Sequence, residues 1–568
     1  MIQEILFLLF RRMRLPLIVL ICAYAISVLG FVLIPGQDDT GAVWHMSFFH
    51  AFYFVSFMGS TIGFGEIPYE FTDAQRFWAL FTIYLTVISW LYGIGYLISL
   101  IQDPAFQNVM RHSRFYYEVK RIRDPFYLVC GYGDTGEHLV EEMSQRYFRS
   151  VVVDIDQSRI DHLTVTDLHL VVPGICGDAS DPSVLKTAGL ENPYCIGLVA
   201  LTNDDQANLS ASIAAKLISP KLKVISRAET LEYEANLLSF DTDHVVNPYS
   251  SFAEWLAMAI HSPSMYLIHD WMTGLYDKPL SEPLVPPKGT WIVCGYGRFG
   301  KAVIEQLQNE GVQTVLIEAE PEQTGAPRDT IIGSGTEAVT LNEAGIMDAA
   351  GIVAGTNDDA NNLSIIMTAR ALNPGLFAVA RQNRSRNTPL FQAAKLDLAM
   401  QPGAMMAQQV AALMMSPMLV QFLQLAKHQD DEWANILISR ITTLTGEEHP
   451  ITWKYKITAG AAPALYETIE KGGTVTVGDL LRDPTDWECL LGSVPLMISS
   501  PGAPPVMLPE DDHVLHLGDR LLFTGTTEAH NRMGWVINNF NALEYVLTGI
   551  DRPSGYIFQW LHRERIRA

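Results

Sequence analysis

The sequence predicts a helical membrane part near the N-terminus, followed by two similar α/β domains and a small α+β lobe. Two long apolar runs, an internal duplication, and a later change to short strand-like runs support this fold class. A chain of 568 residues is too long for one core, because domains usually hold about 100 to 200 residues. We expect the domains to be residues 1–124, 125–282, 283–428, 429–530 and 531–568.

The two apolar runs, residues 15–34 and 77–101, are long enough to cross a bilayer as helices. Arginines precede the first run and basic residues follow the second, whereas acidic residues lie between the runs. The positive-inside rule then places both ends of the chain in the cytoplasm. We therefore expect a multi-pass protein of the cell membrane.

An aromatic segment between the runs, residues 44–60, is too short to span the bilayer and is typical of a re-entrant helix. Irregular backbone at membrane depth is tolerated only where it is buried in protein or lines a water-filled path. Consecutive carbonyl oxygens along such a path can replace the water around a dehydrated K⁺ ion, and glycines permit the conformation. The predicted selectivity filter for transported K⁺ is Thr61, Ile62, Gly63, Phe64 and Gly65.

The second apolar run contains residues that suggest a gate. Gly93 and Gly95 either form a hinge, because glycine weakens a helix locally, or allow close packing of membrane helices. Further along, Leu97 and Ile101 are candidates for an apolar constriction that closes by dewetting.

The rest of the chain contains an internal duplication. Residues 130–136, Cys-Gly-Tyr-Gly-Asp-Thr-Gly, recur 164 positions later as residues 294–300, Cys-Gly-Tyr-Gly-Arg-Phe-Gly. Asp154 and Glu318 are separated by the same interval, and each ends an apolar run. Thr202 matches Thr356 and Arg227 matches Arg381 with an offset of 154. We call residues 125–282 the first copy and residues 283–428 the second copy.

Each copy has the strand, glycine turn, helix and following acid of a Rossmann-like dinucleotide-binding domain. The acid would accept hydrogen bonds from ribose hydroxyls and repel a 2′-phosphate, so NAD or an adenine nucleotide is favoured over NADP. The predicted nucleotide-binding residues are Gly131, Gly133, Asp134, Gly136, Asp154, Asp178 and Thr202 in the first copy, and Gly295, Gly297, Arg298, Phe299, Gly300, Glu318, Thr356 and Arg381 in the second.

The two copies differ beside the expected phosphates. Asp134 would repel them in the first copy, whereas Arg298 would neutralise them in the second, so we expect tighter nucleotide binding in the second copy. The carboxylates of Asp178 and Asp204 are candidates for a divalent cation such as Ca²⁺, and the alternative is that they cap helices.

Residues 61–66 resemble the potassium-channel signature, with Phe64 where tyrosine is commoner. The two copies resemble RCK domains (regulators of potassium conductance), which share the glycine turn and the Thr-x-Asp-Asp segment with Trk-type regulatory subunits. The resemblance implies two transmembrane helices with a re-entrant pore helix, tandem Rossmann-like RCK domains and an RCK C-terminal lobe. It also implies a homotetramer whose eight RCK domains form a ring gated by nucleotides or divalent cations.

Other classes of protein explain less of the sequence. A net charge of −23 argues against a nucleic-acid partner, because phosphate binding needs clustered Lys and Arg. A membrane-anchored NAD-dependent oxidoreductase would leave residues 61–65 unexplained, and neither copy precedes a domain with an evident acid-base set, so we expect no enzyme. Six cysteines without a C-x-x-C pair suggest reduced, buried thiols.

Overall fold

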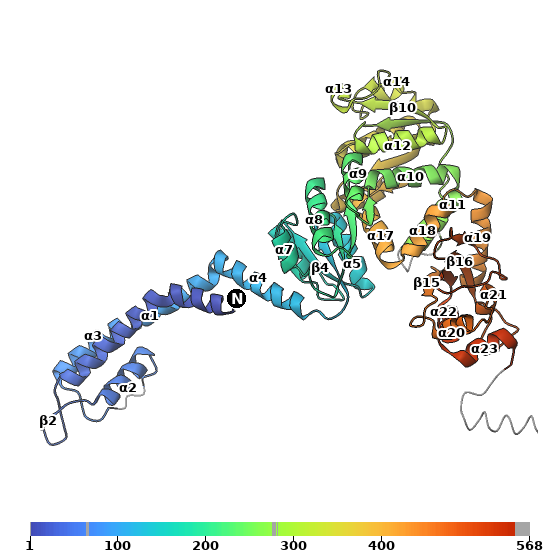
Figure 1. The fold of residues 1–568 in the computed structure, drawn as a ribbon. Helices are drawn as coiled ribbons and strands as arrows, with labels where there is room; N and C mark the ends of the chain where they lie inside the picture. Colours follow the sequence, from blue (N-terminus) through green and yellow to red (C-terminus); the bar gives the residue numbers. More distant parts are fainter. Residues whose placement is uncertain (1, 64–66, 275–279, 281, 551–568) are drawn as a thin grey trace, which may run out of the picture. The chain divides into compact units, whose positions relative to one another are not determined.

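The computed structural model describes residues 2–63, 67–274, 280 and 282–550 (Figure 1). Two of the predicted filter residues, Phe64 and Gly65, lie outside this part. The chain forms two compact units, Met1–Arg123 and Asp124–Ala568.

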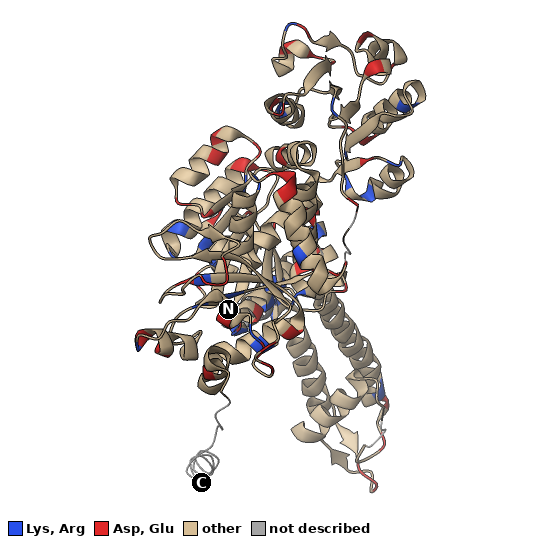
Figure 2. Ribbon diagram, turned by 90° about the vertical axis from the view of Figure 1, so that its right-hand side faces the viewer, with Lys and Arg blue, Asp and Glu red and all other residues tan. Residues whose placement is uncertain are grey.

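The first unit is helical. Its elements are α1 (Ile2–Leu33), β1 (Gly36–Gln37), β2 (Val43–Trp44), α2 (Phe48–Gly59), α3 (Asp73–Gln102) and α4 (Pro104–Arg121). Residues Arg11–Leu33 of α1 and the whole of α3 are long and apolar enough to cross a membrane. Few residues along these two helices are coloured as charged in Figure 2.

Close contacts hold α1 against α3. A methyl group at Gly30 would lie 2.0 Å from the Trp78 ring, so only glycine admits the indole there. The Trp78 Nε1–H donates to the Ser27 carbonyl oxygen at 3.1 Å. Helix α3 begins at a capping box in which the Thr72 hydroxyl accepts from the Gln75 N–H. The predicted transmembrane pair is therefore a packed helical hairpin.

The segment after the second span is the amphipathic helix α4. Asp103 caps it by accepting from the Ala105 N–H at 2.8 Å, and Pro104 occupies its first turn. Asp103 also pairs with Arg12 of α1. These caps explain why the chain turns at Asp103 and continues as a new helix.

The first copy folds as a parallel six-stranded sheet in the order β5-β4-β3-β6-β7-β8. Its strands are β3 (Phe126–Cys130), β4 (Arg149–Asp154), β5 (Gly174–Cys176), β6 (Cys195–Ala200), β7 (Lys223–Arg227) and β8 (His244–Val246). Its helices are α5 (Asp134–Gln145), α6 (Gln157–Val165), α7 (Pro182–Thr187), α8 (Asp205–Ile218) and α9 (Leu231–Ser239). The strand order reverses between β3 and β6, which is the topological switch point of a Rossmann fold.

The second copy repeats this topology in the order β11-β10-β9-β12-β13-β14. Its strands are β9 (Thr290–Cys294), β10 (Gln313–Glu318), β11 (Ile331–Ile332), β12 (Gly351–Ala354), β13 (Phe377–Arg381) and β14 (Leu398–Met400). Its helices are α12 (Arg298–Asn309), α13 (Pro321–Thr324), α14 (Ala338–Glu343), α15 (Asp359–Leu372) and α16 (Thr388–Ala393), with short 3₁₀ turns at Ile346–Asp348 and Ser385–Asn387. The predicted fold class, a helical membrane part followed by two Rossmann-like domains, is confirmed.

Each copy ends in two crossover helices. These are α10 (Pro248–His261) and α11 (Pro263–Thr273) after the first copy, and α17 (Pro402–Met415) and α18 (Pro417–Ala426) after the second. Helix α10 packs against α12, and α17 packs against α5, so each copy covers the glycine-turn helix of the other. Although α17 and α18 are apolar, their buried side chains belong to the cores of this unit.

The remaining described residues form the α+β lobe. It contains α19 (Asp431–Thr445), α20 (Pro463–Glu470), α21 (Val477–Leu480), α22 (Thr527–Asn538) and α23 (Phe540–Thr548) around the sheet β15-β18-β16-β17. The strands are β15 (Ile451–Lys456), β16 (Ser493–Ser499), β17 (Val506–Met507) and β18 (Arg520–Gly525). Side chains of α22 and α23 share one core with this sheet, so the lobe continues past the predicted boundary at residue 530.

Candidate functional site

The short helix α2 leads directly into the predicted filter. Ser47 caps α2 by accepting from the His50 N–H, and Ser60 follows its last residue. Thr61 then has a φ of 62° and Gly63 a φ of 66°. A β-branched residue rarely adopts a left-handed backbone, which costs about 1 to 3 kcal/mol and is characteristic of functional sites. The backbone of residues 61–63 is therefore held in an unusual conformation.

Contacts with both spans support this conformation. The Ile62 and Gly63 N–H groups donate to the Phe57 carbonyl oxygen at 3.1 and 3.3 Å. Gly59 approaches the spans so closely that a methyl group there would lie 3.0 Å from the Tyr24 hydroxyl and 3.2 Å from Thr86. The C-terminal end of α2 therefore packs closely against both α1 and α3.

The predicted hinge and gate residues lie along α3. This helix is continuous through Gly93 and Gly95, and nothing described in the chain lies within 4 Å of a methyl group built on either glycine. Close packing within one chain therefore does not explain them. Leu97 and Ile101 are exposed in the single chain. Their roles in gating stay predictions.

The glycine turns of the two copies have nearly the same geometry. Gly131 and Gly295 have φ values of 100° and 99°, which favour glycine. A methyl group at Gly136 would lie 2.0 Å from the Gly131 carbonyl oxygen, and one at Gly300 would lie 1.9 Å from the Gly295 oxygen. The first and third glycines thus permit the tight approach of strand and helix.

The predicted acids close these turns. The Asp154 carboxylate accepts from the Tyr132 N–H at 2.5 Å, and Glu318 accepts from the Tyr296 N–H at the same distance. Both carboxylates are at least nine-tenths buried. Asp154 also forms an ion pair with Arg159 at 3.3 Å, and Arg159 lies beside Gly133. The first copy therefore has a cation near its turn that sequence reasoning did not identify.

The predicted threonines lie across the switch point from the acids. Asn208 accepts from the N–H and hydroxyl of Thr202 and donates to the Arg227 carbonyl oxygen, which ties β6 to β7. Asn362 makes the same three bonds with Thr356 and Arg381. Each asparagine begins an Asn-Leu-Ser segment, residues 208–210 and 362–364, and this repeat is the sequence signal for them.

Arg298 does not lie alone at the second turn. Its guanidinium pairs with Glu229 of the first copy, which also pairs with Arg227. It lies over the ring of Tyr249, 5.5 Å from the centroid, and Arg381 lies over the same ring at 5.0 Å. Burial lowers the pKa of Arg381. The structure thus brings Arg298 and Arg381 together on a tyrosine from the opposite crossover helix.

The equivalent place beside Asp134 is different. The residues that correspond to Glu229 and Tyr249 are Asn383 and Gly403, so the sequence alone gave no signal for the charged cluster. A methyl group on Gly403 would lie 3.2 Å from Asp134, and the Ser385 hydroxyl donates to the Asp134 carboxylate at 3.5 Å. The second turn therefore faces a charged and an aromatic side chain, whereas the first faces a hydroxyl and a glycine.

Some predicted site residues have structural roles. Phe299 is fully buried and packs 5.4 Å from the Phe252 ring, so its side chain belongs to the core rather than to a ligand site. Asp178 accepts from Ser180, and Asp204 caps α8. Among the described residues, no three His, Cys, Asp or Glu side chains gather in a metal-binding group. These contacts favour the capping alternative over a cation site.

The two cysteines before the glycine turns are buried, and burial raises the pKa of Cys130 and Cys294 to about 12. They remain protonated thiols at neutral pH. The expectation that all cysteines are buried was wrong for Cys22 and Cys489, which are exposed.

Comparison with known families identifies both units. An ion channel model matches residues 17–103, and the TrkA-N domain model matches residues 127–248 and again residues 291–402. The chain is an ion channel protein with two TrkA-N domains. The channel match includes most of the first span, the whole of the second, α2 and the predicted filter, and the TrkA-N matches include both glycine turns.

Several curated proteins are similar to this channel. Potassium channel protein 1 of Methanocaldococcus jannaschii is 25% identical over 280 residues, which cover 49% of this chain and 80% of that protein. Probable potassium channel protein 2 of the same organism is 25% identical over 27% of this chain and 48% of its own length. A TrkA homolog of the Trk potassium uptake system of Archaeoglobus fulgidus is 22% identical over 50% of this chain and 80% of its own.

Solved structures with a similar course of the chain include two of the GsuK channel. One covers 96% of this channel and all of that chain at 17% identity with a TM-score of 0.49. The other, GsuK bound to NAD, covers 94% of this channel and 99% of that chain at 17% identity with a TM-score of 0.47.

Proposed function

We propose that this chain is the subunit of a potassium-selective channel in which residues 61–65 of four subunits surround the ion path. The observation that carries the proposal is the left-handed backbone of Thr61 and Gly63, directly after a capped helix between two spans. Backbone carbonyls of such a segment can be turned toward a common axis and replace the hydration shell of K⁺. The names of the archaeal relatives agree with K⁺ as the ion.

The regulatory ligand in this proposal is NAD or an adenine nucleotide. A pyrophosphate would bind at the N-termini of α5 and α12, where the helix dipoles and free N–H groups favour anions. The buried acids Asp154 and Glu318 end the neighbouring strands, where a ribose would lie. Ca²⁺ binding at Asp178 or Asp204 stays a prediction, and it would have to compete with the hydrogen bonds that both carboxylates accept from their own loops.

Four chains would place eight TrkA-N domains in one gating ring in the cytoplasm below the membrane. A ligand can open or close the pore only if it binds two shapes of this ring with different affinity. The helix α4 directly follows α3 and is the element through which such a change would reach the second span.

Rubidium flux into liposomes that hold the purified full chain tests the function. NAD, ADP, ATP and Ca²⁺ are added in turn, and barium is added as a pore blocker. We expect barium-sensitive uptake that at least one nucleotide changes. Flux that is never barium-sensitive would overturn the channel proposal, and flux indifferent to every nucleotide would overturn the regulatory part.

A further inference from the structure

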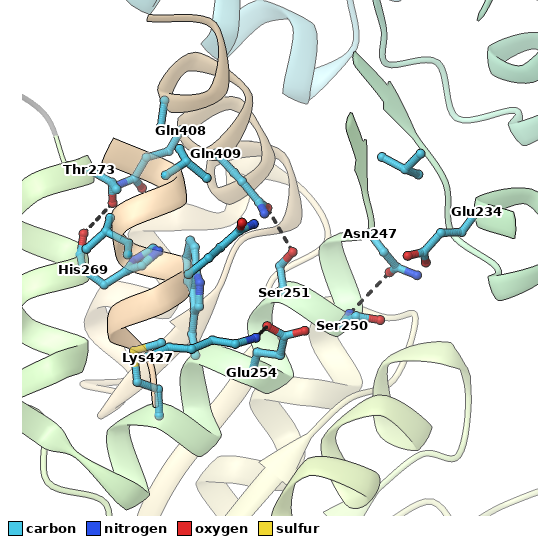
Figure 3. A pocket seen from close by; sticks show the side chains of 17 residues that line it. Glu234, Asn247, Ser250, Ser251, Glu254, His269, Thr273, Gln408, Gln409 and Lys427 are labelled. Carbon is cyan, nitrogen blue, oxygen red and sulfur yellow. Dashed lines mark hydrogen bonds and ion pairs between the residues drawn. The ribbon is translucent and has the colours of Figure 1, made fainter. Parts of the chain in front are cut away.

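A cavity of about 410 Å³ lies between the crossover helices of the two copies (Figure 3). Helices α10, α11, α17 and α18 form most of its wall, and Glu234, Val245 and Asn247 of the first copy complete it. This volume is in the range of small-molecule sites, which are about 300 to 1,000 Å³. The cavity is separate from both glycine turns, and neither the channel nor the nucleotide proposal uses it.

The cavity is lined by equivalent positions of the two copies. Five lining residues of the first copy have their duplicates, 154 positions later, in the same lining. The pairs are Glu254 with Gln408, Trp255 with Gln409, Met258 with Ala412, His269 with Leu423, and Thr273 with Lys427. Helices α10 and α17 also pack against each other. The contacts across the cavity join non-equivalent positions: Lys427 pairs with Glu254, and Gln408 donates to the Thr273 hydroxyl at 3.5 Å.

The paired positions have diverged in chemistry. An acid of the first copy corresponds to an amide in the second, an indole to an amide, an imidazole to leucine, and a hydroxyl to an ammonium group. Packing alone would favour apolar side chains here, whereas most of the lining is polar. The divergence gives the two ends of the cavity different character, which suits a ligand without two-fold symmetry bound in one orientation.

Opposite charges from the two copies face each other in the cavity. The Lys427 Nζ lies 3.5 Å from a Glu254 carboxylate oxygen, and these side chains are 37% and 49% exposed. A pair this long and this exposed stabilises the fold by about 1 kcal/mol or less, so a ligand can separate the charges at little cost. Figure 3 shows the pair reaching across from α10 and the end of α18.

Aromatic and hydrogen-bonding groups surround this charge pair. The rings of Trp255 and His269 lie 4.9 Å apart between centroids, tilted by 55° to each other, and give this part of the wall an aromatic surface. The Ser251 hydroxyl donates to Gln409 at 2.9 Å, which leaves the Gln409 amide N–H₂ able to donate to a ligand. Burial lowers the pKa of His269 to about 4, so the imidazole is neutral at pH 7 and adds no second cation.

We infer that this cavity binds a small zwitterion of amino-acid size. Its carboxylate pairs with Lys427, its ammonium group pairs with Glu254, and its side chain lies against Trp255. Each loose half of the present ion pair is then replaced by a charge-assisted hydrogen bond. Because the ligand contacts both copies, its binding stabilises one arrangement of the crossover helices.

Thermal unfolding of the full chain in detergent micelles tests this site without any measurement of ion flux. The standard L-amino acids are added one at a time at millimolar concentration, and calorimetric titration then measures the affinity of those that raise Tm. We expect at least one to bind, and Lys427→Met and Glu254→Gln each to weaken it about tenfold or more. Lys427→Arg keeps the charge and is expected to retain binding.

Lys471→Met is the matched control, because Lys471 forms a surface ion pair with Glu467 in the α+β lobe. It should leave the affinity unchanged. The N-acetyl and carboxamide derivatives of the bound amino acid should bind at least about tenfold more weakly, since each lacks one charge. The inference is wrong if no amino acid changes Tm, if both cavity variants bind normally, or if the cavity instead takes Ca²⁺ through Glu254.

Discussion

The two glycine turns have almost the same backbone, yet the surfaces opposite them differ. At the second turn, Arg298 meets Glu229 and Tyr249 from the first copy. At the first turn, Asp134 meets Ser385 and Gly403 from the second. The two copies share the turn geometry, because any side chain at the third glycine would collide with the backbone. The residues that face the turns across the interface are not constrained in this way, and they differ between the copies. The difference separates the residues that make the fold from those that adjust a ligand site.

Substitution of the third glycine of either turn should have the largest effect on stability, because both positions lie against a backbone oxygen. Gly300→Ala and Gly136→Ala each place a methyl group about 2 Å from a backbone oxygen. We expect each to destabilise the protein by about 3 kcal/mol or more. Thermal unfolding of the full chain measures this. Gly297→Ala is the control, because nothing described lies within 4 Å of its methyl group, and an equal loss of stability there would contradict this account.

Exchanging the charges of residues 298 and 134 should have an intermediate effect. It tests directly whether these charges cause the difference in nucleotide affinity between the copies. Arg298→Asp is expected to weaken nucleotide binding in the second copy by about 10- to 100-fold, and Asp134→Arg to strengthen it in the first by about tenfold. Titration with labelled ADP measures both sites.

Arg440→Asp makes the same charge change on the exposed face of α19 and serves as the control for Arg298→Asp. Its affinity for ADP should match that of the unchanged protein. If neither exchange at the turns alters the affinity, the predicted asymmetry between the copies is wrong.

Protonation of His269 in the crossover helix α11 should have the smallest effect on the protein. Burial lowers the pKa of His269 to about 4, partly offset by Asp270, whereas the second copy has Leu423 at this position. The unfolded chain therefore binds more protons than the folded one as the pH falls from about 6.5 to about 4, so the protein should lose stability over this range. Thermal unfolding at several pH values measures the loss.

His269→Leu tests the assignment of this pH dependence, because it copies the residue of the second repeat. The variant should lose less stability on acidification than the unchanged chain. An identical pH profile would show that His269 does not cause the dependence.

The sequence predicted both spans, the short helix before the filter, and both Rossmann-like topologies, because long apolar runs and repeated glycine turns are local signals. It also predicted Asp154 and Glu318 at the turns, since the strand that precedes each acid fixes its position. It did not predict Glu229, Tyr249 or the helical form of residues 104–121. Glu229 and Tyr249 contact Arg298 across the interface between the copies, and no local sequence pattern predicts a contact of this kind. The sequence did not show that the Phe299 side chain is buried in the core, and a role of Phe299 in nucleotide binding stays a prediction.

The most direct test of the central claim is the reversal potential of single channels in a planar bilayer with K⁺ on one side and Na⁺ on the other. The account predicts a potential close to that of a K⁺-selective pore, and an open probability that changes when NAD or ADP is added to the side of the TrkA-N domains. Gly63→Ala should abolish selective current, because Gly63 has a φ of 66°. A reversal potential near zero, the value for a pore that does not distinguish the two ions, would contradict the account.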